Sequence, residues 1–324
     1  MIVNYPRMKR RVKGWPDDLD TVLEFSSANP FSISAPKNWD GKLEYTNGSG
    51  WKMWDGSAIA SGEIEKNHYI YLRGTGNSKI TGTTSSSVKW SIIGTNIACN
   101  GDIDLLLDYS TVKNGNRPAM VSYCYSNMFQ GCTSLTAAPS LPATTLANNC
   151  YNSMFYGCTS LTTAPSLPAT TLKTNCYNSM FQGCTSLTTA PSLPATTLAS
   201  NCYYYMFYGC TSLTTAPSLP ATTLANNCYN SMFKVCTSLT TVPSLPATTL
   251  KINCYNSMFY LCTKIKLSTT ASGTYTKSYR IPKNGTGTTA SGALVYMFGN
   301  TGGTFNGAPK INTTYYLDES NTIV

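Results

Sequence analysis

Cysteine is the residue whose number and spacing most invite chemistry in this chain. Of its 13 cysteines, 12 fall in two series that each repeat every 26 residues, and Cys99 stands outside both. The first series is Cys124, Cys150, Cys176, Cys202, Cys228 and Cys254, and the second is Cys132, Cys158, Cys184, Cys210, Cys236 and Cys262. Thiols in such an array could pair as disulfides, bind a metal or fill a core.

The spacing within one repeat disfavours the first two roles. Cys150 and Cys158 would lie about 12 Å apart along a helix, and a disulfide needs Cα atoms within about 7 Å. Metal sites use close pairs such as Cys-x2-Cys, and the sequence has none. We therefore expect no metal, no cofactor and buried free thiols that pack as small apolar groups. Disulfides between neighbouring repeats stay open as the alternative.

Carboxylates are distributed just as unevenly. Twelve of the 14 acidic residues precede residue 109, and residues 109–317 contain none. Cleavage of a glycosidic bond uses two carboxyl groups, so the repeats cannot supply a polysaccharide hydrolase site. Before the repeats, Glu63, Glu65 and His68 lie close together in sequence, and a solvated strand edge explains them better than a catalytic pair. We expect that the protein is not an enzyme.

The net charge of +9 raises the question of nucleic-acid binding. Its densest part is an N-terminal cluster formed by Arg7, Lys9, Arg10, Arg11 and Lys13. The other cations are spread thinly, without the basic stripe interleaved with aromatic residues that a nucleic-acid groove requires. We expect no nucleic-acid partner, and we interpret the cluster as a docking segment for another protein.

Membrane insertion and export are also not expected. No stretch approaches the roughly 20 apolar residues of a membrane span. The basic cluster is followed by Gly14, Trp15, Pro16 and three aspartates rather than by the apolar segment of a secretory signal. The sequence therefore predicts no membrane partner and no usual export route.

Each 26-residue repeat divides into two local patterns. In the repeat that opens at Cys150, Met154 and Cys158 follow at intervals of four, and Tyr151 with Phe155 forms a second pair at the same interval. This spacing predicts a short helix over 150–158. Downstream, 161–165 predicts a short strand that ends at a proline. One helix and one strand in 26 residues fit the length of a leucine-rich repeat.

The residues before the repeats follow a different pattern. Short β-rich runs at 31–34, 42–46, 69–73 and 88–93 are separated by Gly, Asn and Ser turns. The predicted fold class is therefore mixed, with a small all-β, immunoglobulin-like module before a leucine-rich-repeat solenoid of about seven units. The predicted domains are a docking arm over 1–20, a β-sandwich over 21–100, a solenoid cap over 101–123, repeats over 124–267, and an insertion, degenerate last repeat and cap over 268–324.

The repeat motif resembles a known family. Met-Phe-x-Gly-Cys-Thr-Ser-Leu-Thr, the Leu-Pro-Ala-Thr-Thr-Leu run and the 26-residue period are similar to the BspA-type leucine-rich repeats of surface proteins. The resemblance covers about 124–267 and extends weakly to 318. It implies a non-enzymatic surface or adhesion protein, of a kind that phages also encode, and an all-β module before the repeats.

The repeats are near copies, so the positions that vary are informative. The residue after each Met-Phe varies, and its period predicts one row along the array. The row consists of Gln130, Tyr156, Gln182, Tyr208, Lys234 and Tyr260, and Tyr203, Tyr204 and Tyr205 widen it in the fourth repeat. Aromatic and amide side chains suit contacts with sugars or proteins. The other interpretation is a solvated face, and the Thr pairs such as Thr162 and Thr163 form a second candidate surface.

These observations predict a virion-associated attachment protein of a bacteriophage, of the tail-fibre or decoration type. Its expected partners are a host cell-surface glycan or protein and, through the N-terminal arm, other virion proteins. Its expected location is the virion, and a homo-oligomer is left open. The alternative is a bacterial cell-surface adhesin of the BspA type.

Overall fold

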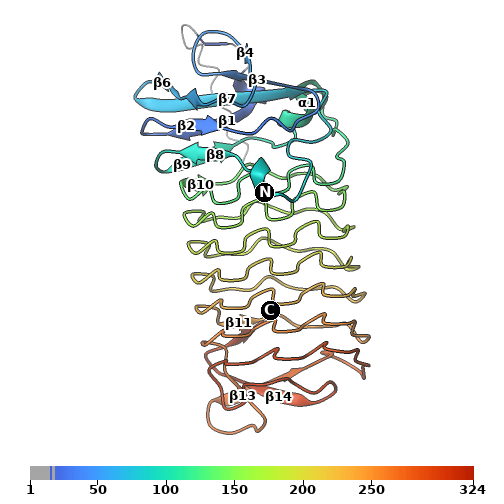
Figure 1. The fold of residues 1–324 in the computed structure, drawn as a ribbon. Coiled ribbons are helices and arrows are strands. Elements are labelled where there is room, and N and C mark those ends of the chain that lie inside the picture. Colours follow the sequence, from blue (N-terminus) through green and yellow to red (C-terminus); the bar gives the residue numbers. More distant parts are fainter. Residues whose placement is uncertain (1–14, 17–18) are drawn as a thin grey trace.

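The computed structural model describes residues 15–16 and 19–324 of the chain. The predicted docking residues Arg7, Lys9, Arg10, Arg11 and Lys13 lie outside the described residues. The described part is mostly β, with very few helices, and none of its sheets closes into a barrel. It is elongated, with sheets at one end, a long stack of similar loops in the middle and a smaller sheet at the other end (Figure 1).

The N-terminal end consists of two open sheets. The larger has β10 (Leu135–Ala137), β9 (Ile97–Asn100), β1 (Leu23–Ser27), β7 (Asn67–Thr75), β3 (Lys42–Thr46) and β4 (Lys52–Met53) in that order, with β6 (Gly62–Ile64) also paired to β7. The smaller has β2 (Ser32–Ser34) between β5 (Ile59–Ala60) and β8 (Ser91–Ile93). Short 3-10 helices span Leu19–Thr21 and Ser86–Val88. Stacked or edge-on rings of Trp39, Trp54 and Trp90 fill the core of this end.

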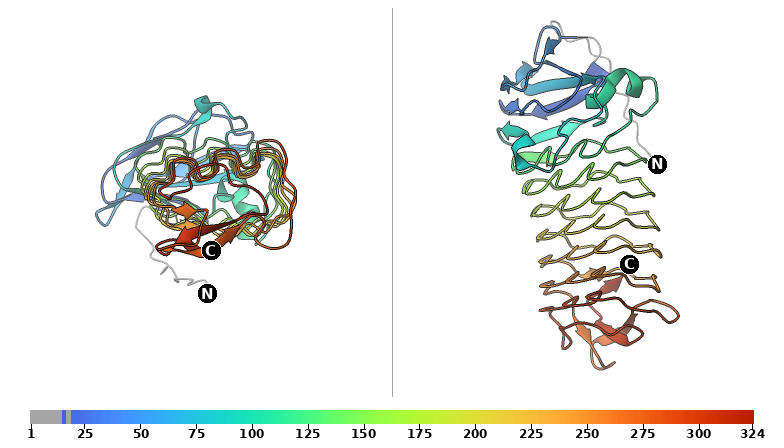
Figure 2. Two further views of the ribbon diagram at one scale, coloured as in Figure 1. Left: turned by 90° about the horizontal axis from the view of Figure 1, so that it is seen from below. Right: turned by 45° about the vertical axis from the view of Figure 1, so that its right-hand side comes forward.

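Residues 124–267 form stacked rungs, where a rung is one 26-residue repeat that starts at its first cysteine. Viewed along the stack, successive rungs superpose (Figure 2). Backbone N–H groups donate to the next rung, as Tyr151 does to the Cys176 carbonyl at 3.0 Å and Phe155 to the Met180 carbonyl at 3.0 Å. Rung 1 therefore begins at Cys124, rung 6 at Cys254, and the register of Tyr255 with Ala293 places the start of rung 7 at Ala293.

The interior of the stack consists of columns of identical side chains. Six consecutive phenylalanine pairs from Phe129 to Phe298 stack with ring centroids 5.3–5.7 Å apart. A parallel column of tyrosines from Tyr125 to Tyr255 stacks at 5.6–5.9 Å. All 13 cysteines are buried and free, so the expected burial of the thiols is confirmed. Offset aromatic stacking and removal of apolar surface from water hold neighbouring rungs together.

The predicted helix over 150–158 is wrong. Alternate N–H groups bond within the rung to the third residue back, as Met154 does to Tyr151, and the others bond to the next rung. Every fourth residue has positive φ: Asn149 at 57°, Ser153 at 52° and Gly157 at 70°. The interval of four therefore marks a chain of tight turns, and Asn, Ser and Gly occupy the left-handed positions that they tolerate best.

The predicted strand in each rung is reduced to isolated bridges. Thr163 pairs in parallel with Thr189, which pairs with Thr215, and a second line of bridges runs from Thr145 through Thr171 to Thr197. Only β10 in rung 1 and β11 (Thr241–Val242) in rung 5 extend these bridges into strands. Two lines of parallel bridges and the chain of turns thus form the sides of the stack.

Both ends of the stack are covered. At the first rung, β9 pairs with β10, and Phe25 and Trp90 place their rings 6.2 and 6.0 Å from that of Phe129. Helix α1 (Leu105–Lys113) buries its first three leucines beside this junction. At the last rung lie β12 (Leu267–Ser268), β13 (Tyr275–Arg280) and β14 (Thr314–Asp318), and β15 (Thr322–Ile323) pairs with β11. In the described part of the chain, the apolar interior of the first and last rungs is thus covered by these segments.

Candidate functional site

The structure brings the predicted row of variable residues into register. The five row residues from Tyr156 to Tyr260 each accept, at the carbonyl, a hydrogen bond from the preceding rung. The Gly131 N–H donates to Tyr156 at 2.7 Å, Gly183 donates to Tyr208 at 2.8 Å and Val235 donates to Tyr260 at 2.8 Å, with Gln182 and Lys234 bonded in the same way at 2.7 and 2.8 Å. Gln130, Gln182, Tyr208, Lys234 and Tyr260 are half-buried, and Tyr156 is 38% exposed.

In rungs 4 to 7 the side chains of this row join with further aromatic residues. The Lys234 ammonium lies 5.8 Å from the Tyr208 ring centroid and 5.0 Å from that of Tyr260, so one cation sits between two rings. The Tyr205 ring is 5.5 Å from that of Tyr208 and 4.1 Å from that of Tyr204. We call the surface formed by Tyr204, Tyr205, Tyr208, Lys234, Tyr260 and Tyr296 the tyrosine–lysine face.

Rung 7 completes this face. The Tyr296 ring lies edge-on to that of Tyr260 at 6.4 Å and is 62% exposed. Asn300 donates a hydrogen bond to the Tyr260 hydroxyl at 3.0 Å. Sequence reasoning missed Tyr296 and Asn300, although aligning rung 7 on its Tyr-Met-Phe-Gly would have placed Tyr296 in the column of Tyr205.

Two residues of the fourth rung behave differently from each other. Tyr203, expected to widen the row, is 1% exposed and belongs to the buried tyrosine column, so that expectation was wrong. The reason is its place directly after Cys202, which is an interior position in every rung. Tyr204 is half-buried, and its partial burial and the Tyr205 hydroxyl raise its pKa to about 12. Its hydroxyl is therefore neutral at physiological pH.

The tyrosine–lysine face is built against local conformational preference. Rungs 2, 3, 5 and 6 have Ser with positive φ at the position of Tyr205, and there the Ser hydroxyl donates to the preceding Asn at 2.8–2.9 Å. Rung 4 has Tyr204 and Tyr205 in place of this Asn–Ser pair, with Tyr205 at φ 55°. The position that is Gly in rungs 1 to 4 is Val235 and Leu261 in rungs 5 and 6, both at φ 63°. Bulky and β-branched residues are unfavourable in this region.

The electrostatics around the face have one sign. Between Tyr109 and Leu317 the chain has nine lysines and two arginines and no carboxylate side chain. Within the face only Lys234 carries a charge, and it lies over the neutral rings of Tyr208 and Tyr260. The face can therefore offer flat aromatic area, amide and hydroxyl hydrogen bonds and a single positive charge.

The second candidate surface is the exposed threonines. Thr162, Thr163, Thr188 and Thr189 are exposed, and several threonine hydroxyls donate to a carbonyl of the preceding rung, as Thr240 does to Thr214 at 3.2 Å. Their side chains therefore support the stacking of the backbone. Their identity does not vary in rungs 2 to 5, unlike that of the tyrosine–lysine face.

The cluster of Glu63, Glu65 and His68 lies in a hairpin. Glu63 is directly opposite His68 in the pairing of β6 with β7, and Glu65 and Lys66 form the turn with φ of 47° and 72°. Both glutamates are exposed, and His68 is half-buried. A solvated strand edge remains the interpretation of this cluster.

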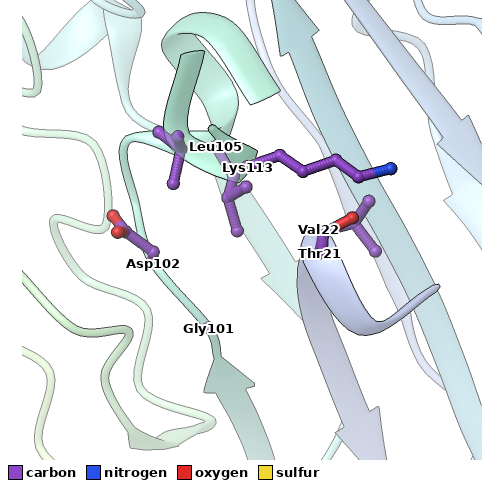
Figure 3. A pocket seen from close by; sticks show the side chains of 7 residues that line it. Thr21, Val22, Gly101, Asp102, Leu105 and Lys113 are labelled. Atoms are coloured by element: carbon purple, nitrogen blue, oxygen red, sulfur yellow. The ribbon is translucent and has the colours of Figure 1, made fainter. Parts of the chain in front are cut away.

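A pocket of about 480 Å³ opens beside α1, where the segment before β1 and the loop after β9 meet (Figure 3). Thr21, Val22, Gly101, Asp102, Leu105, Val112 and Lys113 line it. The Asp102 carboxylate and the Lys113 ammonium lie at opposite sides of the pocket, and Arg117 is hydrogen-bonded to Asp102. The lining residues do not form a nucleophile with an adjacent base, which acid–base or covalent catalysis would need.

Asp104 is the most perturbed carboxylate near this pocket. It accepts a hydrogen bond from the Tyr125 hydroxyl at 3.1 Å and lies 3.5 Å from Arg117. Burial, with a further contribution from Asp102, raises the pKa of Asp104 to about 6. Its contact with the first member of the tyrosine column gives it a role in joining α1 to the stack.

Among residues 15–16 and 19–324, no group of three or more His, Cys, Asp or Glu side chains is arranged to hold a metal ion. Burial raises the pKa of the stacked thiols, for instance to about 12 for Cys184. In the described part of the chain, no helix has the length and apolar character needed to cross a bilayer.

Comparison of the chain with family models, with curated proteins and with solved structures gave no match.

Proposed function

We propose that the protein is a non-enzymatic attachment protein of a bacteriophage particle, which presents its stacked rungs to the host cell. The observation that carries this proposal is the tyrosine–lysine face. Tyr204 and Tyr205 of the face replace the Asn–Ser pair of other rungs. Tyr205 has positive φ, as do Val235 and Leu261, which follow the face residues Lys234 and Tyr260, so these side chains stand where they are conformationally unfavourable. Residues that disturb the fold without stabilising it are best explained by contact with a ligand.

The buried thiols support a virion origin over a secreted one. Thirteen free cysteines, twelve of them in near-identical repeats, would offer many wrong pairings to a chain that folds in an oxidising compartment. Folding in a reducing cytoplasm before release by lysis avoids those pairings. The same argument disfavours a bacterial adhesin, which must fold after export.

The fold supports the same kind of protein. We propose that the rungs are a solenoid of about seven 26-residue units of the BspA-type leucine-rich-repeat class, and that the two N-terminal sheets are an immunoglobulin-like module. Extended stacks of this kind bind partners through long surfaces rather than through deep pockets. The module would hold the stack on the particle, together with the basic segment before it.

Binding of labelled full-length protein to a panel of bacterial strains, animal cells and extracellular matrix tests this function. The matched variant is Y204N/Y205S, which restores the Asn–Ser pair of the other rungs and should fold at least as well. We expect selective staining of particular bacterial strains by the unmodified protein and loss of that staining in the variant.

Two other results would overturn the proposal. Staining of animal matrix alone would indicate an adhesin of the bacterial surface. Staining of nothing, or staining that Y204N/Y205S leaves unchanged, would remove the tyrosine–lysine face as the attachment surface. Mass spectrometry of purified virions provides a separate check, because a virion protein must be detected there.

A further inference from the structure

We infer that the tyrosine–lysine face binds a polysaccharide that carries carboxylate groups at wide intervals. This inference rests on the proposed attachment function and names the chemical class of the receptor. Three properties of the face support this inference: its aromatic area, its charge and the arrangement of its polar groups.

The aromatic area suits sugar rings. Tyr204, Tyr205, Tyr208, Tyr260 and Tyr296 form a connected series over four rungs, with ring centroids 4.1–6.4 Å apart except where Lys234 lies between two of them. The C–H faces of pyranose rings pack on such surfaces, and tyrosines lose little conformational entropy when they bind. A series that spans several rungs favours a chain of sugars over a single small molecule.

The charge of this region favours an acidic ligand. Residues 109–317 contain eleven cationic side chains and no carboxylate, so no anion of this region opposes the approach of a negatively charged chain. Lys234 lies 5.0–5.8 Å from two tyrosine rings and is the one cation of the face. A carboxylate on the ligand would give this ammonium the anionic partner that the rungs themselves do not supply.

The density of charge separates a polysaccharide from a nucleic acid. A nucleic acid carries one phosphate per nucleotide, and its binding depends on several cations along the path of its backbone. The tyrosine–lysine face has a single cation over four rungs. A glycan in which neutral sugars alternate with uronic acids matches that spacing more closely than a polyphosphate does.

The neutral polar groups complete the match. Tyr156 of rung 2 and Gln182 of rung 3 continue the row beyond one end of the face. At the other end, Asn300 of rung 7 donates a hydrogen bond to the hydroxyl of Tyr260 in rung 6. Amide and hydroxyl groups at the edges of an aromatic surface can donate to and accept from sugar hydroxyls. The face therefore offers sugar contacts on both sides of its one cation.

The test measures binding of the full-length protein to immobilised hyaluronate, which has one carboxylate per disaccharide, and to carboxyl-reduced hyaluronate as the uncharged form of the same chain. Polygalacturonate and single-stranded DNA serve as denser polyanions. We expect binding to hyaluronate that weakens with salt, little binding to the reduced form, and no preference for DNA.

Variants locate this binding on the face. K234Q places at rung 5 the residue that rungs 1 and 3 already have, and we expect it to weaken hyaluronate binding about fivefold. K234R should retain binding, and Y204N/Y205S should weaken it at low and at high salt. K173Q removes an exposed lysine outside the face and serves as the matched control, with unchanged binding expected.

The outcomes distinguish this inference from the function on which it rests. Attachment to bacteria without binding to hyaluronate, or with tighter binding to polygalacturonate than to hyaluronate, would overturn the inference of widely spaced carboxylates and leave the attachment function standing. Equal loss in K234Q and K173Q would also overturn it, as would DNA binding as tight as hyaluronate binding. Absence of binding to every cell type tested would overturn the attachment function itself.

Discussion

Rungs 2 and 3 (150–201) and rungs 4 to 6 (202–267) share one interior. Cys, Tyr, Met, Phe and Leu recur at the same positions in both regions, are buried, and stack on their counterparts in neighbouring rungs. The outer faces differ. Rungs 2 and 3 keep Asn, Ser and Gly at the tight turns, whereas rungs 4 to 6 replace several of them with Tyr, Val and Leu.

This difference separates two kinds of constraint. An interior side chain touches the same residue above and below, so a change in one rung affects its neighbours on both sides. An outer side chain is not fixed by matching neighbours above and below it. At a position with positive φ, the residues favoured by folding are those that tolerate this conformation, such as Asn and Gly. Where the outer residue opposes that preference, folding does not explain it. Under the proposed function, the outer differences mark the surface that meets a partner.

The largest effect is expected from the interior. Phe155 and Tyr156 are adjacent in rung 2, but Phe155 is fully buried between Phe129 and Phe181 at 5.6 Å from each, whereas Tyr156 is 38% exposed. F155A should lower the free energy of unfolding by about 3–5 kcal/mol because it leaves a cavity in the column. Chemical denaturation followed by circular dichroism measures this.

Y156A provides the control for that prediction, since it also removes an aromatic ring and should change stability by about 0.5 kcal/mol or less. Similar losses for the two variants would contradict the separation of interior from exterior. They would indicate that Tyr156 is structural, and its row would lose its interpretation as a free surface.

The sequence predicts the interior better than the path of the backbone. The period of 26 and the apolar positions identify the stacked core and the register of the outer row from Gln130 to Tyr260. The helix was wrong because intervals of four occur both in helices and in chains of four-residue turns. Asn149, Ser153 and Gly157 held the distinguishing signal, since Asn, Ser and Gly at the same interval indicate repeated left-handed residues.

Contacts between distant segments were beyond the sequence for another reason. The pairing of β9 with β10 and the contact of Asp104 with Tyr125 depend on how the N-terminal sheets sit on rung 1. No local pattern specifies such a contact. The threonines show that a local pattern can also predict too much. Their strand propensity is evident in the sequence, but apart from β10 and β11 they form only isolated bridges.

The buried tyrosine column differs at its first member, and this offers a second comparison. Among the contacts described for this column, only the Tyr125 hydroxyl lies within hydrogen-bonding distance of a carboxylate, that of Asp104. Burial, with a further contribution from Asp102, raises the pKa of Asp104 to about 6. An unfolded chain has a value of about 3.9, so the folded state binds the proton more tightly. This contribution to stability is present below about pH 4 and is lost as the pH rises through 6.

D104N should therefore be more stable than the unmodified protein at pH 7.5, by about 2 kcal/mol, and this advantage should shrink towards pH 4.5. Urea denaturation at several pH values measures the difference. D108N is the matched control, because the Ser110 hydroxyl lowers the pKa of Asp108 to about 2, and loss of that charge should destabilise at pH 7.5. A D104N advantage that does not change with pH would contradict the assignment.

The smallest expected effect comes from exchanging one outer residue between the two regions of the stack. Val235 has φ of 63° at the position where Gly183 has φ of 72°. A Cβ built on Gly183 would lie 3.7 Å from the Gly157 Cα, which is an ordinary contact, so the backbone conformation alone should determine the effect. G183V should destabilise by about 1 kcal/mol, and V235G should stabilise by a little less because glycine gains more freedom on unfolding. Thermal unfolding of both variants, with binding to host cells measured in parallel, tests whether the strained residue serves contact rather than folding.

We expect V235G to bind more weakly while it unfolds at a higher temperature, because Val235 follows Lys234 and fixes the backbone that presents it. If V235G loses stability, Val235 contributes packing that outweighs its strain, and the outer face of rung 5 is then explained by folding alone.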